Sequence, residues 1–134
     1  MTEAKTSPNV QTIKKWYEAT RTGDRAAMAA LCTADVKWEI TPGFPHSGTF
    51  VGLESIFASF FAPLLQDFDE WRSVPDTILD AGDDVIGLGQ YHARASATGK
   101  NTTAAFAHIW TIKDGRIRRL RQYADTVQLT RALT

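Results

Sequence analysis

The segment from Phe106 to Asp125 constrains the fold most strongly, because it joins two strand-like runs through an Asp-Gly pair. The runs cover residues 102–112 and 116–124, and Asp114-Gly115 lies between them. An Asp-Gly pair flanked by such runs is among the strongest short-range signals of a β-hairpin. The second half of the chain is therefore predicted to be built around this hairpin.

Further runs before the hairpin predict an antiparallel sheet. One long run covers 85–97, and two shorter ones are expected near 68–74 and 76–80. The pairs of turn residues at Gly82-Asp83 and Gly99-Lys100 separate these runs. The tail, 126–134, is predicted to be weakly helical.

Helical spacing dominates the first half of the chain. Ser7-Pro8 predicts a helix start and Gly23 its left-handed end. Asp24 then predicts the start of a second short helix, whose apolar face should carry Met28, Leu31 and Cys32. A wide apolar stripe predicts a third helix over about 53–65, and Pro63 is expected to kink or end it. Between the last two helices, residues 36–40 alternate as a half-buried strand and are followed by an aperiodic loop.

Length and charge limit the possible classes of protein. The chain has 134 residues, which suits a single domain over 1–134. Fifteen basic residues balance fifteen acidic ones, so neither nucleic acid nor an anionic membrane is an expected partner. MTEAKTS at the start has no apolar run, so no secretory signal is expected and the predicted location is cytoplasmic. Cys32 is the single cysteine and is predicted to be a small core residue.

Helices followed by a run of strands predict an α+β fold with an antiparallel sheet. Four segments carry a resemblance that spans nearly the whole chain: TGD at 22–24, LCTADVKWE, SGTFVG, and FAHIWTIKDGRIRRLRQYADT. With these segments the chain resembles the SnoaL-like and ketosteroid isomerase-like branch of the nuclear transport factor 2-like superfamily. The resemblance implies a cone of about three N-terminal helices on a curved, mainly antiparallel mixed β-sheet that encloses an apolar pocket. It also implies a homodimer formed through the outer sheet face.

The chemistry of the resembled enzymes can be tested position by position. Ketosteroid isomerase uses an aspartate base, a tyrosine and a protonated aspartate. The resemblance places these positions on Ile40, Trp16 and Ala107, so steroid isomerisation by that mechanism is not expected. The acid of limonene epoxide hydrolase, and by the same alignment that of the polyketide cyclases, falls on Gln122. An amide cannot exchange a proton as a carboxylate does, and the acid of this strand is instead Asp125.

Counting cross-strand partners outward from Asp114-Gly115 assigns the two faces of the hairpin. Ala107 is then opposite Gln122, and Ile109 is opposite Leu120. Because a cavity needs space, this small-residue face is predicted to be a wall of the pocket. The other predicted pocket residues come from the first helix, the strand 36–40, the third helix and the strand 85–97: Trp16, Tyr17, Trp38, Ile40, Phe57, Phe60 and Tyr91.

The other face of the hairpin then carries large aromatic and basic residues. Its members are His108, Trp110, Arg119, Arg121 and Tyr123, which suit a dimer interface. Trp110 and Arg119 are expected to form a cation–π pair. A register slip or bulge would instead turn His108 inward, as a general base oriented by Asp125. The alternative role of Asp125 is the N-cap of the tail helix.

Two functions remain open. The first is a cofactor-free isomerase, cyclase, dehydratase or hydrolase that acts on a hydrophobic, oxygen-bearing metabolite, with His108 and Asp125 as candidate catalytic residues. The second is a non-catalytic protein that binds a small hydrophobic molecule in the same pocket. No metal or cofactor is expected, because three histidines and one cysteine lie scattered along the chain.

Overall fold

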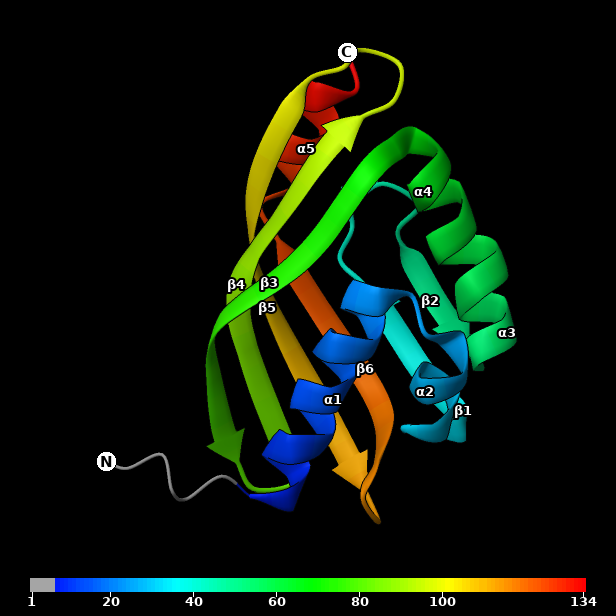
Figure 1. Cartoon of the computed structure of the whole chain (residues 1–134), viewed down its shortest axis with the longest axis vertical. Helices are drawn as coiled ribbons and strands as arrows, with labels where there is room; N and C mark the ends of the chain where they lie inside the picture. The colour runs from blue at the N-terminus through cyan, green and yellow to red at the C-terminus, as the bar shows by residue number, and fades with distance from the viewer. Residues whose placement is uncertain (1–6) are drawn as a thin grey trace.

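The computed structural model describes residues 7–134 and shows an α+β fold, as predicted (Figure 1). Helices pack against one six-stranded mixed sheet that is not closed. The expectation about a secretory signal concerns residues 1–6 and therefore lies outside the described residues. None of the helices in 7–134 is long and apolar enough to cross a membrane.

Local capping explains where the first two helices begin and end. Helix α1 covers Pro8–Thr22 and helix α2 covers Arg25–Ala30. The Ser7 side chain accepts a hydrogen bond from the Val10 amide, and Asp24 caps α2 through the Ala27 amide. Gly23 has φ +70°, the left-handed conformation that glycine adopts without strain. These sequence predictions are confirmed, although Cys32 lies in the following strand and not on α2.

The strands form the order β2-β1-β6-β5-β4-β3. Their bounds are β1 Cys32–Ile40, β2 Gly48–Val51, β3 Phe68–Ala81, β4 Asp84–Ala95, β5 Asn101–Lys113 and β6 Arg116–Ala124. Only the pair β1–β6 is parallel within this sheet. The two short strands expected near 68–80 are one strand, β3, with an irregularity between Pro75 and Thr77. The aperiodic loop also contains a short strand, β2.

The third helix runs without a break but changes from α-helical to π-helical and back (Figure 1). It consists of α3 Leu53–Ile56, a π-helical turn Phe57–Phe61 and α4 Ala62–Asp67. Pro63 was expected to kink or end the helix near its last turn; the helix does not end at Pro63 and continues to Asp67. The widened π turn ends at Phe61, two residues before Pro63, whose ring nitrogen cannot donate to the backbone oxygens of that turn.

A bulge in β6 sets the register of the hairpin. Ile112 pairs with Ile117, as counted from the turn, but Thr111 pairs with Arg119. Arg118 is therefore an extra residue in β6, and every partner beyond it is displaced by one position. Because side chains alternate along a strand, the displacement exchanges the faces of all β6 residues relative to β5.

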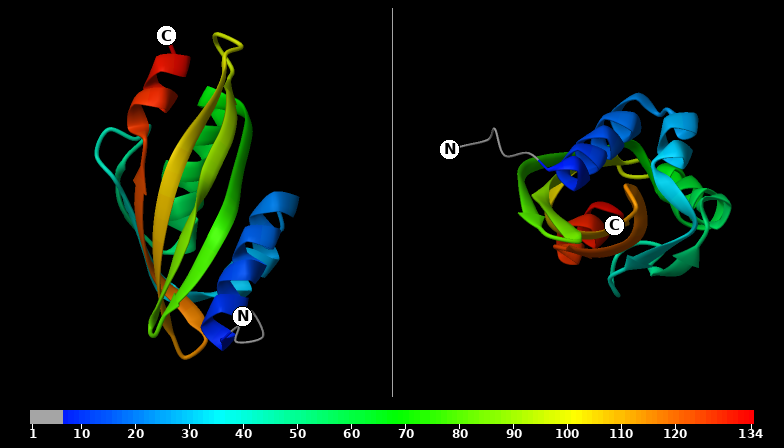
Figure 2. Two further views of the ribbon diagram at one scale, coloured as in Figure 1. Left: turned by 90° about the vertical axis from the view of Figure 1, so that its left-hand side faces the viewer. Right: turned by 90° about the horizontal axis from the view of Figure 1, so that it is seen from below.

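The long strands curve around α1, while α3 and α4 close the open side of the sheet (Figure 2). Helix α5 covers Thr126–Ala132 and contacts β5 at the end of the sheet far from the Asp114-Gly115 turn. The core lies between the concave face of the sheet and the helices. This arrangement leaves a hollow inside the cone.

Candidate functional site

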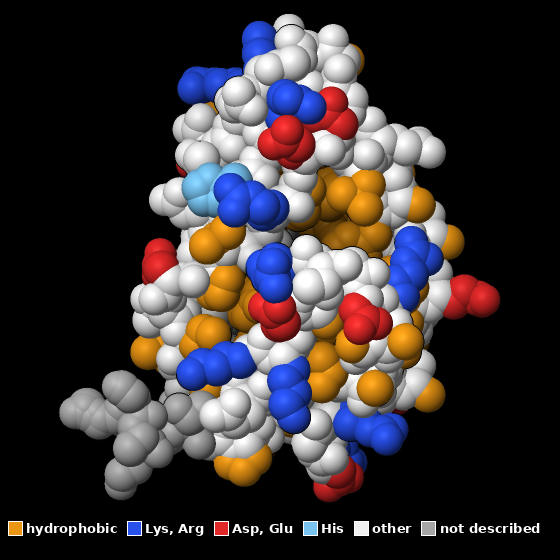
Figure 3. All heavy atoms as spheres, viewed as in Figure 1, with side chains coloured by type: hydrophobic (Ala, Val, Ile, Leu, Met, Phe, Trp, Pro, Cys, Tyr) orange, Lys and Arg blue, Asp and Glu red, His pale blue; other side chains and the backbone are white. Residues whose placement is uncertain are grey.

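A cavity of about 550 Å³ opens between the concave sheet face and the helices. This volume lies within the range of small-molecule sites, roughly 300–1,000 Å³. Figure 3 shows hydrophobic side chains gathered in a hollow that Lys and Arg side chains flank. The sequence prediction of an apolar pocket agrees with this geometry.

Three tryptophans from three different elements pack together at the cavity wall. The rings of Trp16 and Trp38 have centroids 5.2 Å apart, and each lies within 6 Å of Trp110, at 5.7 and 5.5 Å. These tilted and edge-on contacts are the arrangements that aromatic rings prefer. Because α1, β1 and β5 each supply one ring, the cluster ties the first helix to the centre of the sheet.

Most of the predicted pocket residues line the cavity, and two do not. The nine that line it are Trp16, Tyr17, Trp38, Ile40, Phe57, Phe60, Tyr91, Leu120 and Gln122. Ala107 and Ile109 were expected beside them but lie on the opposite sheet face, because the bulge pairs them with Tyr123 and Arg121. Their places on β5 are taken by His108 and Trp110, which do line the cavity.

Four polar side chains and one indole form a continuous hydrogen-bonded chain along the cavity. The Tyr17 hydroxyl is 2.8 Å from His108 Nδ1, and the Tyr91 hydroxyl is 2.7 Å from His108 Nε2. Trp110 Nε1 donates to the Tyr17 hydroxyl at 3.2 Å. At the other end, Gln122 Nε2 donates to the Tyr91 hydroxyl at 2.9 Å. We refer to Trp110, Tyr17, His108, Tyr91 and Gln122 as the polar chain.

Burial keeps the titratable members of the polar chain neutral. His108 is 5% exposed, and desolvation lowers its pKa from 6.5 to about 3. Its ring also stacks on Phe106 with centroids 3.9 Å apart, which excludes water from one face. Desolvation raises the pKa of both Tyr17 and Tyr91, although the hydrogen bonds from Trp110 and Gln122 act in the opposite direction. The site can therefore donate and accept hydrogen bonds without carrying charge at neutral pH.

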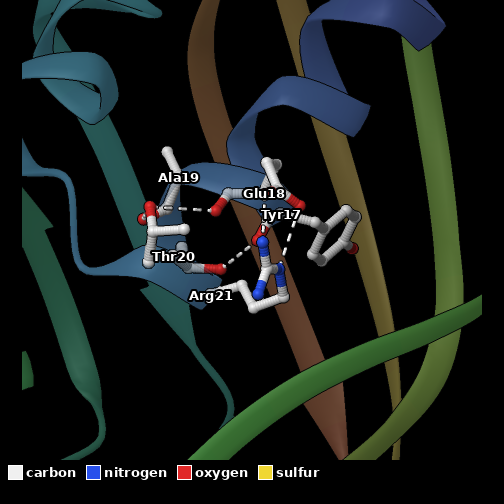
Figure 4. Close-up of polar contacts among 6 residues, drawn as sticks. Tyr17, Glu18, Ala19, Thr20 and Arg21 are labelled. Atoms are coloured by element: carbon white, nitrogen blue, oxygen red, sulfur yellow. Dashed lines mark hydrogen bonds and ion pairs between the residues drawn. The ribbon is translucent and has the colours of Figure 1, made fainter.

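The glycine at position 87 makes room for Tyr17. Gly87 pairs with His108 across β4 and β5, and a Cβ at this position would clash with the Tyr17 hydroxyl. Tyr17 also stacks on Phe106 and His108, so its ring lies flat along β5. Figure 4 shows the Tyr17 ring over the sheet, pointing away from the Glu18–Arg21 pair on the same helix.

The rim of the cavity is basic. Besides Glu18, which is paired with Arg21 and 61% exposed, the charged residues that line it are Lys14, Arg21, Arg25 and Arg72. The Arg25 guanidinium lies 4.5 Å from the centroid of the Phe57 ring. A negatively charged end of a ligand would thus meet cations at the entrance, while its apolar body would enter the aromatic interior.

The predicted roles of the outer face require correction. His108 and Trp110 were placed on that face, but both are buried at the cavity, and Trp110 pairs with Leu120. Arg119 therefore has no cation–π contact with Trp110, and instead donates two hydrogen bonds to Glu39 of β1. Arg119, Arg121 and Tyr123 are still on the outer face, and Tyr123 is 50% exposed.

Asp125 does not orient His108. Both ring nitrogens of His108 are bonded to tyrosines, so that part of the expectation is wrong. Asp125 occupies the N-cap position of α5, as the alternative prediction held, but its side chain makes no capping hydrogen bond. It also does not line the cavity.

The remaining histidine and cysteine side chains lie outside the polar chain. His46 Nε2 is 2.7 Å from Asp67 Oδ2. Cys32 is buried, as predicted, and desolvation raises its pKa to about 12. Within 7–134, no group of three or more His, Cys, Asp or Glu side chains is arranged to hold a metal ion.

Sequence patterns missed several cavity residues. Phe44 lies in the aperiodic loop and still contacts Phe60, Trp71 and Tyr91. A lone aromatic between two prolines of that loop was the available signal. Trp71 was missed because β3 was expected to be two short strands.

Comparison with known proteins agrees with the fold. The family of the SnoaL-like domain matches residues 13–120. An NTF2-like protein from Burkholderia thailandensis is 32% identical, with a TM-score of 0.89 over 96% of this chain and 98% of that one. TerC, crystallised with polyporic acid, is 28% identical, with a TM-score of 0.86 over 95% and 98%. A search of curated proteins finds no match.

A more distant structure shows the same fold. A putative SnoaL-like polyketide cyclase from a Jannaschia species is 17% identical, with a TM-score of 0.84 over 99% of this chain and 96% of that one. The family match and the 32% identical structure both cover most of the chain. The chain therefore belongs to the SnoaL-like family of NTF2-like proteins.

Proposed function

We propose that this protein binds a hydrophobic, oxygen-bearing small molecule in the cavity and catalyses its isomerisation or cyclisation by proton transfer without a cofactor. The observation that carries the proposal is His108, held neutral between the Tyr17 and Tyr91 hydroxyls at the wall of an apolar cavity. Both tyrosines line the cavity, so their hydroxyls are the groups expected to meet the ligand. His108 acts through them as a positioning residue.

The shape and chemistry of the cavity favour an aromatic or ring-containing ligand. Its lining includes four tryptophans and four phenylalanines, which offer flat apolar surfaces. The crystallisation of TerC with polyporic acid supports a small organic acid as a candidate ligand for this chain. The basic rim would hold the acid group, and the polar chain would meet oxygen atoms deeper inside.

Two measurements test binding and chemistry separately. Binding of polyporic acid is measured by calorimetry. Proton transfer is measured as deuterium uptake from D₂O by β-tetralone, a two-ring ketone, followed by NMR. We expect Tyr91→Phe to abolish the protein-dependent uptake, since it removes a hydroxyl at the cavity. Tyr123→Phe is the matched control, because Tyr123 is half exposed on the outer face. Equal uptake by the two variants would contradict the proposal.

A second candidate function is ligand binding without catalysis. It is favoured by the amide at Gln122, the position to which the hydrolase and cyclase acid aligns. Glu18 is also the sole carboxylate among the described residues that line the cavity, and it is paired with Arg21 at the rim. Tight binding of polyporic acid, combined with no deuterium uptake by β-tetralone above the uncatalysed rate, would favour this function.

We infer in addition that the protein forms a homodimer through the outer sheet face. The corrected register gives that face a central apolar strip of Ala107 and Ile109 beside Arg121 and Tyr123. Tyr and Arg are enriched at interfaces, and the formal net charge of zero allows two copies to approach.

A further inference from the structure

The two ends of the polar chain can act only as donors. The indole nitrogen of Trp110 has one hydrogen and no lone pair available for accepting. The Thr41 amide donates to the main-chain oxygen of Gln122 at 3.1 Å and shares its hydrogen with the side-chain Oε1 at 3.3 Å, which orients the Gln122 amide with Nε2 facing Tyr91. Hydrogen bonds therefore enter the chain from both sides, onto Tyr17 at one end and onto Tyr91 at the other.

A count of hydrogens shows that one cannot be used inside the chain. The chain has four hydrogen bonds: Trp110–Tyr17, Tyr17–His108, His108–Tyr91 and Tyr91–Gln122. Each bond uses one hydrogen. Five groups each bring one hydrogen toward these bonds: Trp110, the two phenols, neutral His108 and Gln122. Five hydrogens are one more than the four bonds require. Because Trp110 and Gln122 must donate inward, the surplus hydrogen belongs to a phenol.

The tautomer of His108 decides which phenol has the surplus hydrogen. With the hydrogen on Nε2, His108 donates to Tyr91 and accepts from Tyr17, so the O–H of Tyr91 is unpaired. With the hydrogen on Nδ1, the directions reverse and the O–H of Tyr17 is unpaired. The surroundings of the two nitrogens are closely matched, since each faces a buried phenol oxygen at 2.8 or 2.7 Å that already accepts one N–H.

We propose that His108 exchanges between its two neutral tautomers and so presents the unpaired phenol hydrogen to the ligand at either Tyr91 or Tyr17. This inference rests on the proposed function and specifies its substrate class: a ketone or related carbonyl compound with an acidic C–H. The carbonyl oxygen accepts from one phenol, and the C–H lies beside the other. Both phenols line the cavity, which places the ligand within their reach.

We call the transfer of protons through Tyr17, His108 and Tyr91 the relay. Its protons balance over two passes. In the first, Tyr91 gives its proton to the carbonyl oxygen and takes the proton of His108 Nε2, while Nδ1 takes the proton of Tyr17. Tyr17 takes a proton from the ligand carbon, so that a C–H bond breaks, an O–H bond forms and the ketone becomes an enol. The second pass requires a ketone whose enol is conjugated with a further double bond. Tyr17 then protonates the far carbon of the dienol and takes the proton of His108 Nδ1, while Nε2 takes the proton of Tyr91 and the enol O–H gives its proton to Tyr91. The ketone is isomerised, His108 regains its first tautomer, and no side chain of the relay has changed its charge after either pass.

The tautomers can be observed directly by NMR of the full chain labelled with nitrogen-15 in histidine. His46→Gln and His92→Gln variants assign the His108 signals by elimination. We expect the wild-type protein at pH 7 to show a neutral His108 with both tautomers populated, either as two sets of signals or as averaged shifts of the two nitrogens. A charged His108, or a single tautomer in the wild-type protein, would overturn the relay.

Gln122→Glu is the decisive variant, because a carboxylate of nearly the same shape accepts the hydrogen of Tyr91. The surplus hydrogen is then consumed, and His108 should be fixed with its hydrogen on Nε2. Gln122→Met is the matched control, since it removes the amide but leaves the surplus hydrogen, so both tautomers should persist. Tautomers that respond equally to the two substitutions would overturn the proposal. If Gln122→Glu fails to fold, the wild-type protein and Gln122→Met decide the question.

The same preparations separate this inference from the proposed function. Deuterium uptake by β-tetralone with one fixed tautomer of His108 would remove the relay and leave the proposed function standing. Two tautomers without ligand binding or deuterium uptake would remove the proposed function, and with it the catalytic use of the relay.

Discussion

His108 and Gln122 are cross-strand partners on the concave face of the sheet, and the Tyr91 hydroxyl lies within hydrogen-bond distance of both. The pairing depends on the extra residue Arg118 in β6. Without it, the alternation of side chains would place His108 and Gln122 on opposite faces. The bulge thus brings the amide, the imidazole and the phenol into one site.

The stability of the protein should depend on pH through His108. Burial lowers the pKa of His108 from 6.5 to about 3, so the unfolded chain binds a proton below pH 6.5 that the folded protein does not bind. The contribution of His108 to stability is therefore full above pH 6.5 and is lost as pH falls toward 3. The slope is up to about 1.4 kcal/mol for each pH unit.

Urea denaturation at several pH values between 7.5 and 4 measures this slope. His108→Gln should reduce the slope of the unfolding free energy against pH by the amount that the uptake of about one proton on unfolding produces. His92→Gln is the control, because His92 lies beside Tyr91 on β4 with its side chain on the other face. A wild-type slope that His108→Gln leaves unchanged would show that His108 is not buried as a neutral group.

Gly87→Ala should destabilise the protein by about 1–3 kcal/mol, the usual cost of overpacking a core. The added methyl group would clash with the Tyr17 hydroxyl and push Tyr17 away from His108. Tyr17→Phe removes that hydroxyl, so the double variant should lose less unfolding free energy than the sum of the two single variants. Chemical denaturation of the wild-type protein, the two single variants and the double variant gives the four free energies of this double-mutant cycle. Additive losses would mean that Tyr17 and Gly87 do not compete for this space.

Much of the fold could be predicted because local physics specifies it. Caps at Ser7, Gly23 and Asp24, and the Asp114-Gly115 turn, each satisfy backbone groups within a few residues, so their signals are local. The faces of the hairpin could not be assigned in the same way. One unpaired residue, Arg118, reverses the assignment. Arg116 and Arg119 lie close by in the sequence and are also arginines, so residue type does not mark Arg118 as the bulge.

The polar chain was even less accessible to sequence reasoning. Its members come from α1, β4, β5 and β6, and they meet only when the sheet curves around α1. Tyr17, Tyr91 and Gln122 were each predicted to line the pocket, but their convergence on His108 depends on the register. A buried histidine between two phenols has no sequence spacing that distinguishes it from an exposed one.

The proposed homodimer should dissociate when a charge is placed at the centre of the outer face. Ile109→Glu is suited to this test, because Ile109 pairs with Arg121 and the new carboxylate would face an opposite charge within the sheet. We expect light scattering at micromolar concentration to show a dimer for the wild-type protein and a monomer for this variant. Val51→Glu on the edge strand β2 is the control, since Val51 is already exposed. A monomeric wild-type protein would contradict the interface.

The basic rim should favour anionic ligands. Arg72 lines the cavity and forms no ion pair with residues 7–134, so its charge is available to a ligand at the entrance. ANS, an anionic naphthalene dye, and Nile red, a neutral dye of similar apolar character, separate charge from burial. Arg72→Gln should weaken ANS binding by up to about fivefold, which corresponds to the upper range of roughly 1 kcal/mol for exposed charge pairs. Binding of Nile red should not change, because the apolar interior is intact.

Fluorescence titrations at low and high salt provide the measurement. Added salt should weaken ANS binding to the wild-type protein more than binding to Arg72→Gln, because exposed charges are screened over about 10 Å at 0.1 M salt. Arg118→Gln is the matched control, since Arg118 is an exposed arginine that does not line the cavity. If Arg118→Gln and Arg72→Gln weaken ANS binding equally, the attraction comes from the protein's general charge and the rim does not select the ligand.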